Sequence, residues 1–345
     1  MNRAVLFTLL MLCGLPANSD EQGTSPPATL PSQPLDITLA DENLSYADYP
    51  PPPPFFKNLP GNVLNDLGIF IHRIDPKKNY KFLLGLTATT LVLVKYDQEI
   101  LDGSKRIAEN LGLISDTKSG REGRIVVDFS VGGLDLPVRA PENTNAALYF
   151  LGDGLTHVAI AGGLAIYGAT HDDNRSVDTA GQIMEGILTT GIIVQVLKRT
   201  FGRESPYART EDGGRWDFLP SFSDYSANVS HYDAFPSGHL ATAMTTVTVL
   251  AANYPEKTYI KPVGYTLMAL NAFAMLNNEV HWAADYPLAL AIGWLSGDIA
   301  VERSKQRRQK YKEETKASPI GFQFETILPY AAGNDGAGVL AVFSF

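Results

Sequence analysis

The sequence predicts an all-α protein, with a core of about six helices and a short β-hairpin at the C-terminal end. Apolar residues recur at helical spacing from about residue 60 to residue 312. Patterns typical of strands are confined to residues 111–143 and to the last ten residues. The 345 residues are 45% hydrophobic, which is enough to bury one large core or two smaller ones.

Residues 1–19 are typical of a secretory signal peptide. Arg3 supplies the positively charged N-terminal region, and Ala4–Leu15 form an apolar run too short to span a bilayer. Small residues at Ala17–Ser19 suit cleavage, so we expect a periplasmic or secreted protein. The one cysteine, Cys13, lies within this segment, and bulky Leu12 before it argues against a lipid anchor there. A chain cleaved after Ser19 has no cysteine for disulfides or thiol chemistry.

Residues 20–56 are expected to form a Pro-rich tether. They contain the five-proline run Pro50–Pro54 and little apolar periodicity, a composition that favours extended chain. We expect an α-helical domain over residues 57–315. Residues 316–345 then form a C-terminal extension, whose loose alternation from Gly336 onward predicts a hairpin packed on the domain.

The helical pattern divides into segments separated by a strand-like region and a loop. We predict helices over Asn62–Arg73, Tyr80 to about Asn110, Asn145–Ala169, Thr179–Arg199, Gly238–Asn253, Lys261–Asn277 and about Ala284 to Lys312. Residues 200–235 should be a loop. The runs Ile160–Ala169 and Leu267–Leu276 are apolar nearly all round, but each is interrupted before about 18 apolar residues accumulate. Buried central helices therefore fit better than a polytopic membrane protein.

The charge balance limits the possible partners. A formal charge of −9 argues against a nucleic-acid partner, which favours a basic face, but leaves room for a local cationic pocket. The run Arg303–Lys312 is strongly cationic. Such a run suits the C-terminal end of a helix, and contact with an anionic membrane surface is the alternative.

The stretch Phe235–His239 is the first candidate for chemistry. Ser237 is a natural N-cap, and the backbone N–H groups that follow have no partner within their helix. Gly238 lets an anion approach those amides closely, and His239 adds a proton donor in the first turn. An ordinary capped helix with a surface histidine is the alternative.

Two further clusters flank this stretch. Gly202 is suited to end a helix, which places Lys198 in the last turn and Arg203 in the following loop. His281 and Asp285 are four residues apart, so the carboxylate could hold one imidazole nitrogen and leave the other exposed. Each cluster alone is more often structural than functional.

Together, these clusters resemble the type 2 phosphatidic acid phosphatase superfamily, which includes secreted acid phosphatases and vanadium haloperoxidases. That family carries Lys-x6-Arg-Pro, Pro-Ser-Gly-His and Ser-Arg-x5-His-x3-Asp motifs on a helical core. This chain matches the first at Lys198 and Pro206, the second completely at Pro236–His239, and the third at His281 and Asp285. The resemblance covers roughly residues 60–310.

The resemblance implies a phosphatase that works through a phosphohistidine and needs no metal or other cofactor. His281 would attack phosphorus and Asp285 would orient it, while His239 would protonate the leaving oxygen. The implied phosphate-binding residues are Lys198, Arg203, Ser237 and Gly238. The substrate would be a phosphate ester, which could be a lipid, with peripheral membrane contact. Nothing in the sequence indicates the oligomeric state.

Two departures from the family pattern bear on activity. Ser205 and Met275 stand where the family has arginines, and neither replaces a bidentate guanidinium contact with phosphate. A weakened or inactive member that binds an anion, lipid or partner is therefore an alternative, and a vanadate-dependent peroxidase is a third. Arg203 could serve as a substitute phosphate ligand, or it could pair with Glu204 or another acid of its loop.

Overall fold

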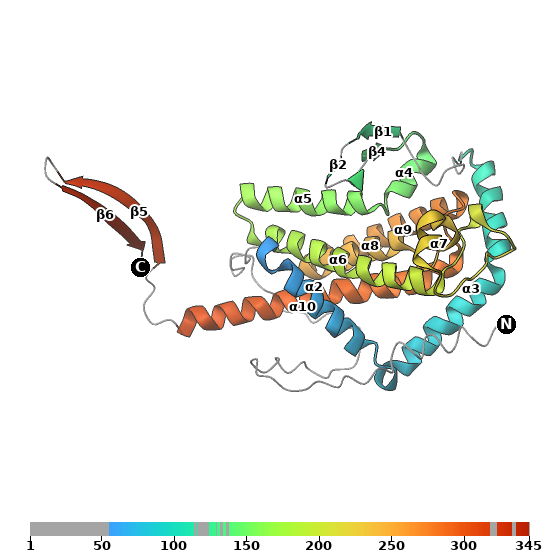
Figure 1. Cartoon of the computed structure of the whole chain (residues 1–345), viewed down its shortest axis with the longest axis horizontal. Coiled ribbons are helices and arrows are strands. Elements are labelled where there is room, and N and C mark those ends of the chain that lie inside the picture. Colours follow the sequence, from blue (N-terminus) through green and yellow to red (C-terminus); the bar gives the residue numbers. More distant parts are fainter. Residues whose placement is uncertain are drawn as a thin grey trace.

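The computed structural model describes residues 55–113, 115, 124–128, 130–131, 134–135, 138–317, 323–332 and 336–344. The predicted signal peptide and nearly all of the Pro-rich tether lie outside the described residues. Figure 1 shows a bundle of helices from which one long helix extends toward a C-terminal hairpin.

The all-α prediction is confirmed. The described residues form α2 (Phe55–Arg73), α3 (Pro76–Asn110), α4 (Thr144–Phe150), α5 (Gly154–Thr170), α6 (Asn174–Phe201), α7 (Phe222–Ala227), α8 (Gly238–Asn253), α9 (Ile260–Asn277) and α10 (Tyr286–Ala317). Every predicted helix is present, but the one predicted over Asn145–Ala169 is broken into α4 and α5, which meet at an angle of 63°. The short helix α7 lies in the region predicted to be loop.

Local sequence explains where several helices begin and end. The side chains of Asp75, Asn143, Asp153, Asp173 and Ser237 accept hydrogen bonds from the first backbone N–H groups of α3, α4, α5, α6 and α8. Gly202 ends α6 as predicted, in a left-handed conformation with φ 52°. A Cβ atom there would lie 1.9 Å from the carbonyl oxygen of Asp217, so only glycine fits.

Helices α6, α8 and α10 form the centre of the bundle, packed closely through glycines. A Cβ atom on Gly293 of α10 would lie 2.1 Å from the carbonyl oxygen of Ala241 on α8. Gly297 approaches Thr245 in the same way, and Gly186 of α6 contacts the Thr245 side chain from the other side. This close packing fixes the start of α8 relative to α6 and α10.

The prediction that the apolar runs of α5 and α9 are buried holds only for part of α9. Ile166 of α5 is 69% exposed, and Leu267 and Leu270 of α9 are each 40% exposed, whereas Met268, Met275 and Leu276 of α9 are buried. Helix α5 turns small residues such as Ala161 inward, so its large apolar side chains lie outside. By length and composition alone, α6 is one helix that could cross a membrane, and the bent pair α4–α5 would be a second if it formed one span.

The three arginines of the cationic run in α10 are paired with acids of neighbouring helices. Arg303 lies 3.1 Å from Asp66 on α2, and Arg307 lies 3.1 Å from Glu185 on α6. Arg308 pairs with Asp178, also on α6. These arginines therefore hold α10 to its neighbours.

The strands form three separate antiparallel pairs. In the region predicted as an irregular hairpin, β1 (Arg124–Val127) pairs with β4 (Val138–Ala140), and β2 (Ser130–Val131) pairs with β3 (Leu134–Asp135). The predicted terminal hairpin is present as β5 (Gln323–Ala332) and β6 (Gly336–Ser344), joined antiparallel. Figure 1 shows it beyond the end of α10 and away from the bundle, not packed on the domain.

Candidate active site

The Pro-Ser-Gly-His stretch begins α8, as predicted. The Ser237 hydroxyl caps the helix by accepting a hydrogen bond from the N–H of Leu240 at 3.5 Å, and the residue is fully buried. The Ser237 N–H donates to the carbonyl oxygen of Asp285 at 3.1 Å. Ser237, predicted to bind phosphate, therefore already uses both its hydroxyl and its amide inside the protein. Gly238 instead lines the neighbouring pocket.

His281 and Asp285 are brought together by a 3₁₀ turn rather than by one face of an α-helix. The turn covers Ala283–Asp285, and α10 begins only at Tyr286, with Pro287 in its first turn. The Asp285 Oδ2 lies 3.2 Å from His281 Nδ1 and accepts a hydrogen bond from the N–H of Trp282 at 2.8 Å. A proton on Nδ1 leaves the lone pair of His281 on Nε2.

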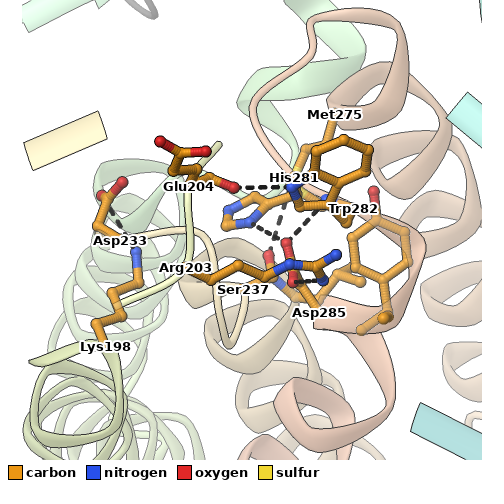
Figure 2. A network of polar contacts seen from close by, with 12 residues as sticks. Lys198, Arg203, Glu204, Asp233, Ser237, Met275, His281, Trp282 and Asp285 are labelled. Atoms are coloured by element: carbon orange, nitrogen blue, oxygen red, sulfur yellow. Dashed lines mark hydrogen bonds and ion pairs between the residues drawn. The ribbon is translucent and has the colours of Figure 1, made fainter. Parts of the chain in front are cut away.

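Arg203 lies behind Asp285 instead of in the pocket. Figure 2 shows its guanidinium beside the carboxylate, with Nη1 2.8 Å from Asp285 Oδ1. Its Nη2 donates to Asp97 Oδ2 at 2.6 Å and to the carbonyl oxygen of Gly213 at 2.8 Å. The side chain is fully buried, and Trp282 is one of two indole rings that it stacks on. The expectation of a phosphate contact at Arg203 does not fit this geometry, because the guanidinium is engaged by acids other than Glu204.

Asp97 of α3 is a residue of the site that sequence reasoning missed. It is fully buried, and its Oδ1 accepts a hydrogen bond from the N–H of Ala284 at 2.9 Å, so it supports both the turn and Arg203. Burial raises its pKa, and the positive charge of Arg203 opposes that shift. One acidic residue within a long helix is too common a feature to have identified it.

A pocket of about 190 Å³ opens beside the start of α8. It is lined by Gly152, Gly154, Thr190, Gly191, Val194, Gln195, Lys198, Gly238, His239 and Thr242. Three of the predicted site residues, Lys198, Gly238 and His239, thus line one pocket. The ring of His239 lies 6.2 Å from that of His281, centroid to centroid.

His239 is held in a poorly solvated position. Its Nε2 is buried and has no hydrogen-bond partner among the described residues. Burial is the main cause that lowers the pKa of His239 to about 3, and the neighbouring ammonium group of Lys198 adds to the shift. In the free protein His239 is therefore neutral at pH 7. A bound anion would raise its proton affinity.

The turn between α4 and α5 encloses His239 and was also missed. The Tyr149 ring lies 4.6 Å from the His239 ring, and a Cβ atom on Gly152 would lie 2.8 Å from that of His239. Asn271 of α9 holds the turn by donating to the carbonyl oxygens of Leu148 and Tyr149 at 3.0 and 2.7 Å. The sequence Gly152-Asp153-Gly154 was the available signal for this helix break.

Positive charge is scarce in the pocket. Among the described lining residues, Lys198 is the only lysine or arginine, and its Nζ lies 3.5 Å from Asp233 Oδ2 (Figure 2). Met275, at the position of a family arginine, is fully buried with its sulfur 3.6 Å from the Ser237 hydroxyl. Ser205, at the other position, is also buried.

Parts of this chain are similar to known proteins. Residues 179–309 match the sequence model of the PAP2 superfamily. A lipid A 1-phosphatase of Porphyromonas gingivalis is 31% identical over 68 residues, which are 19% of this chain and 15% of that protein. The crystal structure of Aquifex aeolicus LpxE aligns with 46% of this chain and 83% of its own, with 23% identity and a TM-score of 0.34.

The matched segment holds the predicted residues of all three clusters, from Lys198 to Asp285. Its three central helices, α6, α8 and α10, carry or border the paired histidines and the pocket. Residues 179–309 of this chain therefore belong to the PAP2, or type 2 phosphatidic acid phosphatase, superfamily.

Proposed function

We propose that this protein hydrolyses a phosphate monoester, with His281 as the nucleophile. The observation that carries the proposal is the His281–Asp285 pair, because Asp285 holds Nδ1 at 3.2 Å and leaves Nε2 with the lone pair. The second histidine, His239, is 6.2 Å away between ring centroids, close enough for both imidazoles to act on one phosphoryl group.

In the proposed reaction, His281 Nε2 forms a bond to phosphorus while the bond from phosphorus to the alcohol oxygen breaks. His239 gives its proton to that oxygen and later takes one from the water that hydrolyses the phosphohistidine. Since the pKa of His239 is about 3 in the free protein, it would gain this proton when the phosphate anion is bound.

Lys198 and the first amides of α8 around Gly238 would bind the phosphoryl oxygens and stabilise the charge that develops on them. Arg203 and Asp97 would act indirectly. They hold Asp285, and through it the imidazole of His281, in place. They are positioning residues in this proposal.

We infer further that the phosphate is carried by a lipid and that the protein contacts a membrane surface from the periplasm. The matched relative is named for a lipid substrate, although the match spans only 15% of its length. Large apolar side chains are exposed on several helices of the bundle, including Ile160 and Ile166 on α5, Ile192 on α6, and Val263 and Leu267 on α9. Such a surface fits contact with acyl chains.

One set of observations favours a second function, anion binding without turnover. Both family arginines are absent, and the remaining pocket lysine, Lys198, already has a partner in Asp233. Losing one preorganised donor costs about 10²–10³ in rate. Two such losses would leave a slow enzyme or a binding protein.

The test is turnover of p-nitrophenyl phosphate and of a lipid phosphate in vesicles by purified protein. We expect activity that survives His171→Ala, a change at an exposed histidine, and that is lost in His281→Ala. Rapid quenching should trap an acid-labile, alkali-stable phosphoenzyme only in proteins that keep His281. Phosphate binding without turnover in the wild type would favour the second function. Equal turnover by both variants would contradict His281 as nucleophile.

A further inference from the structure

We infer that the pocket beside His239 receives the leaving alcohol, and that Gly154 and Gly191 make it wide enough for a slender aliphatic chain. This inference rests on the proposed function, since it assigns the part of the substrate that departs. It adds two specificity-determining residues, one at the start of α5 and one within α6.

The position of the pocket points to the leaving group rather than to the nucleophile. His239 lines the pocket, whereas His281 and Asp285 do not. In an in-line displacement the attacking and leaving atoms lie on opposite sides of phosphorus. A phosphoryl group between the two histidines would therefore direct its ester oxygen toward His239 and its alcohol into the pocket.

The pocket runs along α6, away from Lys198. Its lining residues on this helix extend from Lys198 back to Thr190, a distance of about 12 Å at the rise of an α-helix. The glycines keep this path open. A Cβ atom on Gly154 or Gly191 would meet no other atom within 4 Å. A larger side chain at either position would project into open space rather than into the protein.

The residues that line the pocket suit an uncharged alcohol. Beyond Lys198 and His239, no described lining residue carries an ionisable side chain. The Thr190 hydroxyl is engaged with that of Thr245 at 2.9 Å. Next to the lining residues, Leu155 and Ile192 are 50% and 44% exposed, so the pocket opens beside apolar surface. Gln195 and Thr242 are the other polar side chains of the lining, and Gln195 Oε1 already accepts a hydrogen bond from Arg199.

The first experiment measures kcat/KM for ethyl, butyl, hexyl and octyl phosphate below their micelle concentrations. Each methylene that leaves water for the pocket should improve kcat/KM about fourfold until the pocket is full. Glycerol phosphate and glucose 6-phosphate serve as polar counterparts. If they match or exceed hexyl phosphate, the assignment of an aliphatic leaving group is overturned.

Variants then test the two glycines. Gly191→Leu and Gly154→Val should flatten the dependence of kcat/KM on chain length. Gly163→Leu is the matched control, because it adds the same side chain to an exposed helical glycine with open space but outside the pocket. Thermal unfolding would establish that each variant is folded. If kcat/KM of a glycine variant rises with chain length as steeply as that of the wild type, the proposed role of the glycines is overturned.

Binding of alkylphosphonates, which cannot be hydrolysed, separates this inference from the proposed function. Calorimetry on the wild type should show affinity that rises with chain length, and Gly191→Leu should remove the rise. That result without any turnover would refute the proposed catalysis and leave the pocket assignment intact. Affinity that is independent of chain length would refute the pocket assignment, whatever the activity.

Discussion

The two sides of the His281 imidazole differ in how completely their polar atoms are paired. On the Nδ1 side, both oxygens of Asp285 and of Asp97 accept hydrogen bonds from Arg203 or from backbone N–H groups, and Arg203 Nε is the buried atom left without a partner among the described residues. On the pocket side, the imidazole of His239 has its Nε2 buried with no hydrogen-bond partner among the described residues. The paired side can hold its geometry without substrate, whereas the pocket side carries a desolvation cost that a ligand would relieve.

The largest expected effect is on the pocket side, at His239. His239→Gln should lower turnover by about 10²–10⁴-fold for alkyl phosphates, whose alkoxide leaves poorly without a proton. The loss should be much smaller for p-nitrophenyl phosphate, whose leaving group is stable as an anion. Steady-state kinetics on both esters measures this. An equal loss for both would mean that His239 shapes the pocket but does not act as an acid.

A comparison of Lys198→Ala with Arg203→Ala contrasts the two sides directly. Lys198→Ala should cost about 10²–10³ in kcat/KM, with little change in the free energy of unfolding. Arg203→Ala leaves Asp97 and Asp285 buried without their cation, so it should destabilise the protein by about 3–5 kcal/mol. Urea unfolding and turnover of each variant give both quantities. An equal loss in the free energy of unfolding for Lys198→Ala and Arg203→Ala would contradict this difference between the two sides.

For Arg203, a conservative variant separates positioning from simple stability. Arg203→Lys keeps the charge but cannot bond both carboxylates in the same plane. We expect it to recover much of the stability, to lower kcat, and to leave KM for phosphate esters nearly unchanged. A rise in KM with normal kcat would instead support direct contact with phosphate.

A smaller effect is expected on stability in acid. Burial lowers the pKa of His157, on α5, to about 4, against 6.5 for the unfolded chain. Its stabilising contribution is complete above pH 6.5 and is lost as the pH falls toward 4, by about 2 kcal/mol at pH 4.5. His157→Gln should weaken this pH dependence, measured by urea unfolding at pH 7 and 4.5. His171→Ala is the exposed control, and an unchanged slope in His157→Gln would contradict the assignment.

The smallest expected effect is a gain from restoring one family arginine. Met275→Arg should bind inorganic phosphate about tenfold more tightly, because a charged hydrogen bond is partly offset by the cost of burying the guanidinium. Met275→Leu keeps the volume and is the control. Phosphate-dependent shifts in unfolding temperature would report the binding. No phosphate-dependent difference from Met275→Leu would place residue 275 outside the phosphoryl site.

Sequence reasoning located the helices and three of the residues that line the pocket, Lys198, Gly238 and His239. Helical periodicity is a local property, and Ser237 and Gly202 mark helix ends through their own backbone requirements. The separation of His281 and Asp285 indicated their contact, but the 3₁₀ turn that makes it depends on Pro287 delaying the start of α10.

What the sequence could not give is the contacts between distant segments. Asp97 lies 106 residues before its partner Arg203, and no local pattern connects them. The prediction for Arg203 relied on its proximity to Lys198 in the chain, but the end of α6 turns its side chain toward two tryptophans and two acids. The exposed faces of α5 and α9 were mistaken for core because a uniformly apolar helix has no periodic signal of which face is buried.

The ion pairs between α2 and α10 have a consequence for shortening the chain. Removing α2 would strip Arg303 of Asp66 and leave Asp298 and Glu302 without Arg73, although those α10 residues lie within the family segment. Glu185 would also lose its hydrogen bond from Asn62. A fragment that begins at residue 179 would therefore carry charged side chains on α6 and α10 without their partners. The smallest piece that folds on its own should begin at α2, well upstream of the segment that defines the superfamily.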